Sequence, residues 1–253
     1  MSLLVMSLIR GLDTPRAAAH CFPRRHTAFH HRCGRALTTS FIMLRGSPWR
    51  YVLKLFYKAG ACSLASHIAL VESGLPFEIE AVDLKTKLTA SGADFTKINA
   101  KGYVPALQID TGEVLTEGPA IMQYIADQAP AKHLAPLNDS MARYRLQSWL
   151  TFIGTELHRN FSPFFNPAAG SDWKAAAMAS LERRLEYTAR HIDDRQYLLG
   201  DEFSIGDAYL FTVLGWAKHI DLDLGKWSAL VAYQARVGAR PGVQAAMKAE
   251  GLI

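Results

Sequence analysis

Cysteine is scarce in this chain, which has only three cysteines among its 253 residues. No two of them form a Cys-x-x-Cys pair, and no group of cysteines and histidines has the spacing of zinc ligands. We therefore expect neither a disulfide framework nor a metal site. The pattern fits a reducing compartment, and we expect the chain to work in the cytoplasm.

Long apolar runs are also missing. The apolar segment Leu3–Ile9 is interrupted by Ser7 and closed by Arg10, far short of the roughly 18 residues that a membrane-spanning helix needs. No basic residue precedes this segment, so it also makes a poor secretory signal. We expect no membrane partner.

Acidic residues are nearly absent from residues 1–50, which contain one, Asp13, beside eight arginines and no lysine. The rest of the chain is close to neutral, so the net charge of +5 belongs to this segment. A neutral body argues against a nucleic-acid partner. We interpret residues 1–50 as a basic, disordered extension outside the fold. It is either a mitochondrial transit peptide or a stretch without a role that precedes a later start at Met43.

Strand and helix patterns alternate through residues 51–131. An apolar β-type run is followed by a glycine-containing loop and by an apolar-periodic helix, which ends near Gly74. A polar connection then leads to a hairpin and to a helix with proline in its first turn. The expected order is βαβ, a link, then ββα. The expected elements are a strand at 52–56, a helix at 62–73, a strand at 77–82, a connection at 84–99, a hairpin of 104–109 with 113–116, and a helix at 118–128.

Residues 138–253 have helical periodicity throughout, after a linker at 129–139 that is rich in Pro, Ala and Asn. Ser204 and Asp207 form a Ser-x-x-Asp cap that can satisfy the free N–H groups of a helix start. The segment therefore forms a second, all-helical domain. We expect helices at 140–164, 172–193, 204–218 and 228–238, and a short one after Pro241.

Cys62 is the candidate for chemistry in the first domain, because it lies between a strand and the N-terminus of a helix. Exposed N–H groups and the helix dipole favour an anion there and so lower a thiol pKa. Ala65 stands where a redox pair would need its second thiol, which excludes dithiol exchange at this position. The alternative is a buried, unreactive cysteine, but the Gly-Ala-Cys-Ser loop favours the reactive interpretation.

Two further segments can form a binding site. A cis bond at Val104-Pro105 would turn the Val104 N–H and C=O outward as an unpaired strand edge that a peptide can join; the alternative is an ordinary trans turn. In Thr116–Pro119, a carboxylate precedes a helix start, and these groups bind an amino group and a carboxylate respectively. The alternative for this segment is a simple helix cap.

Five sequence segments carry a resemblance to a known family, at residues 57–67, 99–107, 115–121, 155–159 and 240–252. The first, Tyr-Lys-Ala-Gly-Ala-Cys-Ser-Leu-Ala-Ser-His, looks like the beta class of bacterial glutathione transferases, which carry cysteine where other classes carry tyrosine or serine. The resemblance covers roughly residues 52–253. It implies the glutathione transferase fold, an α/β thioredoxin-like N-terminal domain followed by an all-α C-terminal domain, with glutathione as co-substrate and no other cofactor.

The resemblance also implies roles for residues of the first domain. Cys62 would lie beside the glutathione sulfur, Lys87 would pair with the glycyl carboxylate, and Val104–Pro105 would bind the cysteinyl unit through the Val104 backbone. Glu117 and the Gly118 N–H would take the γ-glutamyl end. The family usually has serine at the position of Gly118, so one hydroxyl contact is missing and a somewhat weaker affinity for glutathione is expected.

In the helical domain, Thr151, Thr155 and His158 follow i, i+4, i+7 spacing, which places them on one helix face that can border the cleft. Thr155 and His158 match active-site positions of the family, whereas Thr151 stands where asparagine is common. A lone helical histidine is otherwise more often a packing or surface residue. We expect no metal ligands among these residues.

The implied activity is attack of the glutathione thiolate on a small hydrophobic electrophile, with Cys62 and His158 as catalytic residues. A mixed disulfide between Cys62 and glutathione would add thiol-transferase or peroxidase activity. The alternative is a non-catalytic glutathione- or ligand-binding protein of the same fold. The family also implies a homodimer. Aromatic side chains suited either to the acceptor pocket or to plain core are Phe152, Phe161, Phe164, Phe165 and Trp216.

Overall fold

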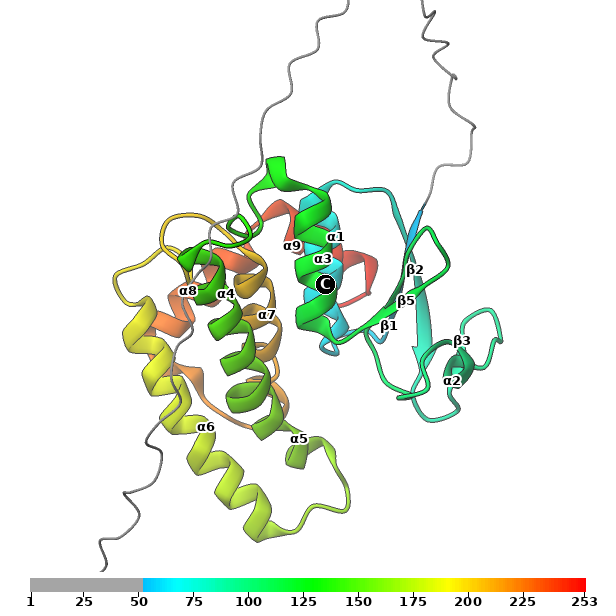
Figure 1. The fold of residues 1–253 in the computed structure, drawn as a ribbon. Coiled ribbons are helices and arrows are strands. Elements are labelled where there is room, and N and C mark those ends of the chain that lie inside the picture. Colours follow the sequence, from blue (N-terminus) through cyan, green and yellow to red (C-terminus); the bar gives the residue numbers. More distant parts are fainter. Residues whose placement is uncertain (1–51) are drawn as a thin grey trace, which may run out of the picture. The chain divides into compact units, whose positions relative to one another are not determined.

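The computed structural model describes residues 52–253, and the basic extension expected at residues 1–50 lies outside this range. The first half of the described chain forms a five-stranded mixed sheet in the order β3-β2-β1-β4-β5 (Figure 1). β1 and β2 pair in parallel, and the other neighbours are antiparallel. The strands are β1 Leu53–Tyr57, β2 Phe77–Asp83, β3 Leu88–Thr89, β4 Ala106–Gln108 and β5 Val114–Thr116.

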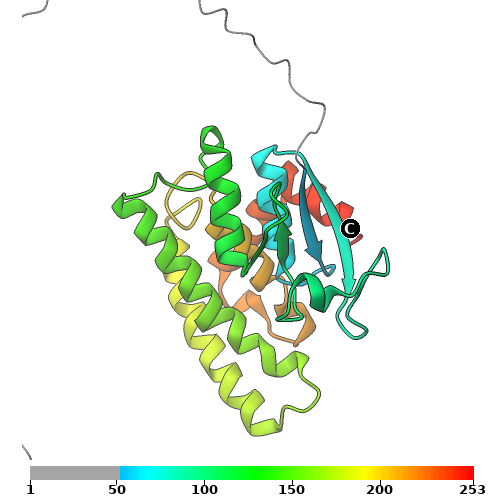
Figure 2. The same ribbon diagram turned by 45° about the vertical axis from the view of Figure 1, so that its right-hand side comes forward.

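Two helices, α1 (Ser63–Ser73) and α3 (Gly118–Gln128), pack side by side against the sheet (Figures 1 and 2). α1 ends where Gly74 takes a left-handed conformation with φ of 68°, which glycine adopts without a steric penalty. The expected βαβ and ββα units are confirmed, including the hairpin of β4 and β5. The connection expected to be featureless instead contains β3 and the short helix α2 (Phe95–Ile98).

The second half is helical, as expected. The expected helix at 140–164 is not uniform, because a π-helical segment at Ile153–His158 separates α4 from α5. Short 3₁₀ turns occur at Pro130–Lys132, Ala217–His219 and Leu224–Lys226. The helices are α4 Met141–Phe152, α5 Arg159–Phe165, α6 Ser171–Ile192, α7 Ile205–Leu214, α8 Ser228–Gly238 and α9 Pro241–Ala249.

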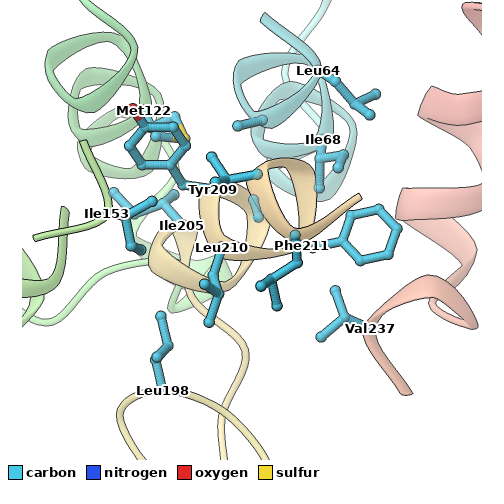
Figure 3. Close-up of a cluster of buried hydrophobic side chains, with 14 of the residues drawn as sticks. Leu64, Ile68, Met122, Ile153, Leu198, Ile205, Tyr209, Leu210, Phe211 and Val237 are labelled. Carbon is cyan, nitrogen blue, oxygen red and sulfur yellow. The ribbon is translucent and has the colours of Figure 1, made fainter. Parts of the chain in front are cut away.

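α7 is the centre of the core, and all ten of its residues are buried. Figure 3 shows this helix against Leu64 and Ile68 of α1 and against Val237 of α8. The predicted cap is present: the Ser204 backbone N–H donates to Asp207 at 2.8 Å, and the cap residues bond reciprocally at the helix start. One buried helix therefore joins the sheet half to the helical half.

The chain returns to the sheet half at its C-terminal end, where α9 packs against α1. Arg240, just before α9, donates two hydrogen bonds of 2.9 Å to the carboxylate of Glu72 in α1. Such paired bonds fix orientation as well as distance. The segment that follows α9 is thereby held beside the loop that carries Cys62.

No helix within residues 52–253 is long and apolar enough to cross a membrane. In the same range, no three His, Cys, Asp or Glu side chains gather into a group that could hold a metal ion.

Candidate active site

Cys62 immediately precedes α1, as the sequence predicts. Its thiol donates a hydrogen bond of 3.3 Å to the Val104 carbonyl. Burial raises the pKa of this thiol to about 11, and the nearby backbone N–H groups of Cys62 and Ser63 offset only part of that effect. The prediction of a lowered thiol pKa is therefore wrong: desolvation outweighs the helix start, and Cys62 is a neutral thiol at pH 7.

The peptide bond between Val104 and Pro105 is cis. Its geometry presents the Val104 carbonyl to Cys62, so this oxygen is not the unpaired strand edge that the sequence suggested. The turn that precedes β4 and the loop that precedes α1 therefore meet at the thiol.

Glu117 stands directly before α3 with φ of 69°, an unusual conformation for a residue other than glycine. Its Oε1 atom accepts hydrogen bonds from Lys101 Nζ at 2.5 Å and from the Tyr103 hydroxyl at 2.7 Å. These two hydrogen bonds lower the pKa of the Glu117 carboxyl. Neither Lys101 nor Tyr103 was predicted as a site residue, although both lie in the segment that carries the family resemblance.

Lys87 lies near this region with φ of 60°, and its Nζ donates to the Gly102 carbonyl at 2.8 Å. Gly102 adjoins Tyr103, so the Lys87 ammonium is held next to the loop that precedes the cis-proline. Lys87 does not itself line the cavity beside Cys62.

A cavity of about 610 Å³ brings most of the predicted residues together. Its walls come from the Cys62 loop, the cis-proline turn, the start of α3 and the π-helical segment. The predicted residues that line it are Cys62, Val104, Pro105, Glu117, Gly118, Thr155 and His158, and those not predicted include Tyr103, Arg159, Ser162 and Tyr209.

Thr151 does not line this cavity, and its hydroxyl donates to the Gln147 carbonyl within α4. The prediction that Thr151, Thr155 and His158 border one cleft is therefore wrong for Thr151. The spacing argument assumed a continuous α-helix, whereas the backbone widens into a π-helical segment from Ile153. Such segments change which side chains share a face and are frequent at functional sites.

His158 lines the cavity from the end of the π-helical segment. Its Nδ1 atom is 2.8 Å from the Tyr209 hydroxyl, and its ring centroid is 4.8 Å from that of Trp216. Burial and the adjacent positive charge of Arg159 lower the pKa of His158 to about 4. The imidazole is therefore neutral at pH 7 and offers one N–H donor and one acceptor.

A second cavity, of about 650 Å³, continues from the first. The two share Ala61, Cys62, His158 and Ser162, so the thiol and the imidazole lie where they join. Three of the five aromatic side chains considered for an acceptor pocket line this second cavity, namely Phe161, Phe165 and Trp216.

The other two aromatic side chains considered for the acceptor pocket, Phe152 and Phe164, belong to packing instead. The Phe152 ring lies 5.4 Å from the rings of Trp149 and Tyr187, and Phe164 packs against the core. For these two residues the plain-core alternative holds.

A chain of hydrogen bonds from the C-terminal segment holds the loop in front of Cys62. The buried side chain of Glu250 contacts His67 Nδ1 at 2.9 Å through Oε1 and accepts from the Gly60 N–H at 3.0 Å through Oε2. The Gly60 carbonyl in turn accepts from the Trp216 indole N–H at 2.9 Å. Two segments far apart in sequence thus fix the same loop, and no local pattern in the sequence indicated these contacts.

A further cavity of about 610 Å³ lies at the linker between the two halves. Asp127, Arg145 and Asp201 are among its lining residues. It brings together no thiol and none of the predicted site residues, so the joined cavities at Cys62 are the candidate active site.

Comparison with known proteins agrees with this arrangement. The family model of the glutathione S-transferase N-terminal domain matches residues 59–128, and that of the C-terminal domain matches residues 171–249. Glutathione S-transferase GstA of Escherichia coli O157:H7 is 48% identical over 201 residues, which span 79% of this chain and all of the relative.

Solved structures share the fold. A ternary complex of BphK, a bacterial glutathione transferase, is 56% identical with a TM-score of 0.78 and covers 78% of this chain and 99% of its own. A sphingomonad glutathione S-transferase in complex with glutathione is 48% identical with a TM-score of 0.77, over 79% of this chain and all of its own.

The same holds for a beta-class structure. The bacterial beta-class glutathione S-transferase of Sphingomonas chungbukensis is 46% identical with a TM-score of 0.77 and covers 79% of this chain and all of its own. The expected fold and the resemblance to the beta class are thereby confirmed. The chain belongs to the glutathione S-transferase family, and it is a transferase that uses glutathione as its co-substrate.

Proposed function

We propose that this chain conjugates glutathione to small hydrophobic electrophiles in the joined cavities beside Cys62. The observation that supports this most directly is the meeting of Cys62, the Val104 carbonyl and His158 where the first cavity adjoins a second one lined by aromatic rings. Glutathione would lie along the first cavity and the electrophile in the second. Domain roles follow: residues 51–131 bind glutathione, and residues 138–253 hold the acceptor.

The glutathione contacts follow the polar groups along the first cavity. The Val104 backbone binds the cysteinyl unit, and Glu117 with the Gly118 N–H receives the γ-glutamyl end, where the start of α3 favours a carboxylate. Lys87 pairs with the glycyl carboxylate from its position beside Gly102. Thr155 contributes a hydroxyl from the opposite wall.

Neutral donors at the junction of the cavities stabilise the reacting sulfur. The glutathione thiol loses its proton to solvent, and its sulfur forms a bond to the electrophilic carbon as the leaving group departs with the electron pair. The Cys62 S–H can turn from the Val104 carbonyl to donate to the glutathione thiolate. If the Tyr209 hydroxyl donates to His158 Nδ1, the opposite ring nitrogen carries the proton and donates into the cavity.

A second activity proceeds through Cys62 itself. Its thiolate attacks the glutathione sulfur of a mixed disulfide between glutathione and another thiol, forms a Cys62–glutathione disulfide and releases the other thiolate. A second glutathione thiolate then attacks this disulfide, forms oxidised glutathione and regenerates the Cys62 thiolate. Because the pKa of Cys62 is about 11, this route is slow at pH 7 and accelerates as pH rises.

We further propose that the chain works as a homodimer in the cytoplasm. Met141 and Tyr144 of α4 leave 67% and 55% of their surfaces exposed, and large apolar side chains on a helix surface favour burial against a second copy. The cytoplasm suits a free thiol that must remain reduced.

Intact mass after incubation with oxidised glutathione, measured beside a glutathione conjugation assay, tests the proposal in wild type and Cys62→Ala. The expected result is an adduct at alkaline pH that is lost in Cys62→Ala, together with conjugation by wild type. Peptide mapping assigns the adduct among the three cysteines. Absence of both adduct and conjugation in wild type would contradict the proposal.

A further inference from the structure

Lys101 is bonded to Glu117, the residue proposed to receive the γ-glutamyl end, and has no role so far. Its Nζ donates to Glu117 Oε1 at 2.5 Å and to Thr116 Oγ1 at 3.0 Å. Its backbone N–H donates to the Asn99 side chain at 3.1 Å. Together with the bond to Glu117, this contact ties the loop before the cis-proline to the start of α3. A cation is therefore bonded to Glu117, which lines the cavity, although Lys101 does not itself line it.

Both members of this ion pair retain an open position. A lysine ammonium has three donors, and the described residues occupy two of those on Lys101. The hydrogen bonds from Lys101 and Tyr103 both fall on Glu117 Oε1, and no described residue donates to Oε2. One N–H donor and one carboxylate oxygen are thus available to a ligand.

An α-amino-acid end matches such a pair, since it carries an ammonium and a carboxylate on one carbon. Glu117 can take only the ammonium, and Gly118 offers the carboxylate a backbone N–H but no hydroxyl. The carboxylate needs a further donor, and the ammonium of Lys101 is the cation bonded to the recognition residue itself.

We propose that Lys101 is a specificity-determining residue that binds the α-carboxylate of the γ-glutamyl end of glutathione, while Oε2 of Glu117 binds its ammonium. This inference rests on the proposed placement of glutathione in the cavity. The Lys101 side chain is 45% exposed, so it can reach the ligand without leaving Glu117. The four charges then alternate, which favours a zwitterion over a ligand with a single charge.

The charge states fit this arrangement. The hydrogen bond to Glu117 raises the pKa of Lys101, and that from Lys101 lowers the pKa of Glu117. Both groups therefore remain ionised across the neutral range.

A competing role predicts the opposite sign. If Lys101 only neutralises Glu117 in the free protein, glutathione must displace it, and removal of Lys101 would strengthen binding. If Lys101 binds the carboxylate, its removal weakens binding. Lys101→Gln distinguishes the two roles. Lys97→Gln is the control, at an exposed lysine of α2 that, unlike Lys101, makes no ion pair with Glu117.

The experiment measures dissociation constants by calorimetry for glutathione and two analogues, one in which the γ-glutamyl unit lacks its α-carboxylate and one in which it lacks its α-amino group. We expect Lys101→Gln to weaken binding of glutathione and of the des-amino analogue about fivefold, as for a partly exposed charged hydrogen bond. The analogue without the carboxylate should bind wild type and Lys101→Gln equally. Lys97→Gln should change none of the three.

Unchanged or tighter glutathione binding by Lys101→Gln overturns the inference, as does an equal loss for the analogue without the carboxylate. Either result leaves the proposed function standing if wild type binds glutathione. Failure of wild type to bind glutathione overturns both.

Gly118 supplies a second, independent test. A Cβ atom at this position would lie 3.7 Å from Pro105 Cγ, an ordinary contact, so a small side chain fits. In a Lys101→Gln background, Gly118→Ser should recover about threefold in affinity because its hydroxyl can donate to the carboxylate, whereas Gly118→Ala should recover nothing. Equal recovery by both would show that the missing group was not a carboxylate donor.

Discussion

The two sides of the cleft are lined by different kinds of chemical group. On the proposed glutathione side, the groups at hand are largely backbone and loop features: the cis turn at Val104–Pro105, the residue before α1, and the first N–H groups of α3. On the proposed acceptor side, the wall includes the aromatic side chains Phe161 and Phe165 of α5 and Trp216 from the turn after α7. Backbone positions are fixed by the fold, while side chains can be exchanged. The glutathione side is thus constrained by the architecture, and the acceptor side is free to change specificity.

The two sides also differ in charge. The glutathione side contains the Lys101–Glu117 ion pair, whereas the acceptor side is aromatic and meets the first at a neutral imidazole. Substitutions on the glutathione side should therefore change the binding of glutathione alone. Substitutions on the acceptor side should change the binding of the acceptor alone. The substitutions of Tyr209 and Phe165 below can contradict that separation.

The largest effect is expected at Glu250, because its carboxylate holds the loop that carries Cys62 and this loop lines both cavities. Glu250→Ala leaves buried His67 and the Gly60 N–H without their partner, so we expect the free energy of unfolding to fall by about 3 kcal/mol. Urea denaturation measures it. Glu182→Ala, which removes only an exposed ion pair with Lys226, should change stability by less than about 0.5 kcal/mol. Similar losses of unfolding free energy in the two variants would show that the buried hydrogen bonds of Glu250 do not stabilise the fold.

The next effect concerns Cys62. With a pKa of about 11, its thiolate fraction rises nearly tenfold per pH unit below that value, so alkylation by iodoacetamide should accelerate about 100-fold between pH 8 and pH 10. A free cysteine peptide, with a pKa of about 8.5, should gain only about fourfold. Peptide mapping by mass spectrometry follows Cys62 separately from the other cysteines. A rate that levels off below pH 9 would mean that burial does not control the thiol.

A smaller change should follow from Tyr209→Phe, which removes the hydroxyl 2.8 Å from His158 Nδ1. We expect kcat to fall about tenfold, since one hydrogen bond orients the ring, while the dissociation constant for glutathione stays the same. Because the pKa of His158 is about 4, its protonation should add no inflection to the wild-type kcat profile between pH 5.5 and pH 7. Tyr187→Phe, at a half-exposed tyrosine of α6 that lines neither cavity, is the control. An equal effect on glutathione affinity would contradict a role confined to the reacting sulfur.

The smallest change is expected at Phe165, which lines only the acceptor cavity and is 52% exposed. Phe165→Ala should raise KM for an aromatic acceptor about fivefold, the loss of part of one ring contact, and leave KM for glutathione unchanged. Trp173→Ala removes a similarly exposed aromatic side chain of α6 that lines neither cavity. A shift in KM for glutathione with Phe165→Ala would show that the two sides are not independent.

Local chain chemistry accounts for what could be predicted. The start of the helix at Gly118–Gln128 is predictable because proline occupies its first turn. The hairpin is predictable because Gly112 marks its turn. The residues around Cys62 and Glu117 follow from the same kind of short segment. These features depend on residues that are close together in the sequence, so one sequence is enough to predict them.

What could not be predicted depends on distant packing. The thiol pKa follows from burial, which no segment around Cys62 reveals. A Cβ added at Gly154 in the π-helical segment would lie 3.6 Å from the Tyr209 hydroxyl, a proximity set by how α7 packs rather than by local propensity. The bond from Gly60 to Glu250 joins residues 190 positions apart. Such contacts arise only once the whole chain has folded.

That last bond has a consequence for the order of events during translation. The loop beside Cys62 leaves the ribosome early, but its anchor, Glu250, is added 190 residues later. A nascent chain that holds only the sheet half would carry the thiol on an untethered loop, without Trp216 or His158 around it. Synthesis itself therefore keeps conjugation from starting before the helical half has been made, and a truncated product would contain the cysteine without its working environment.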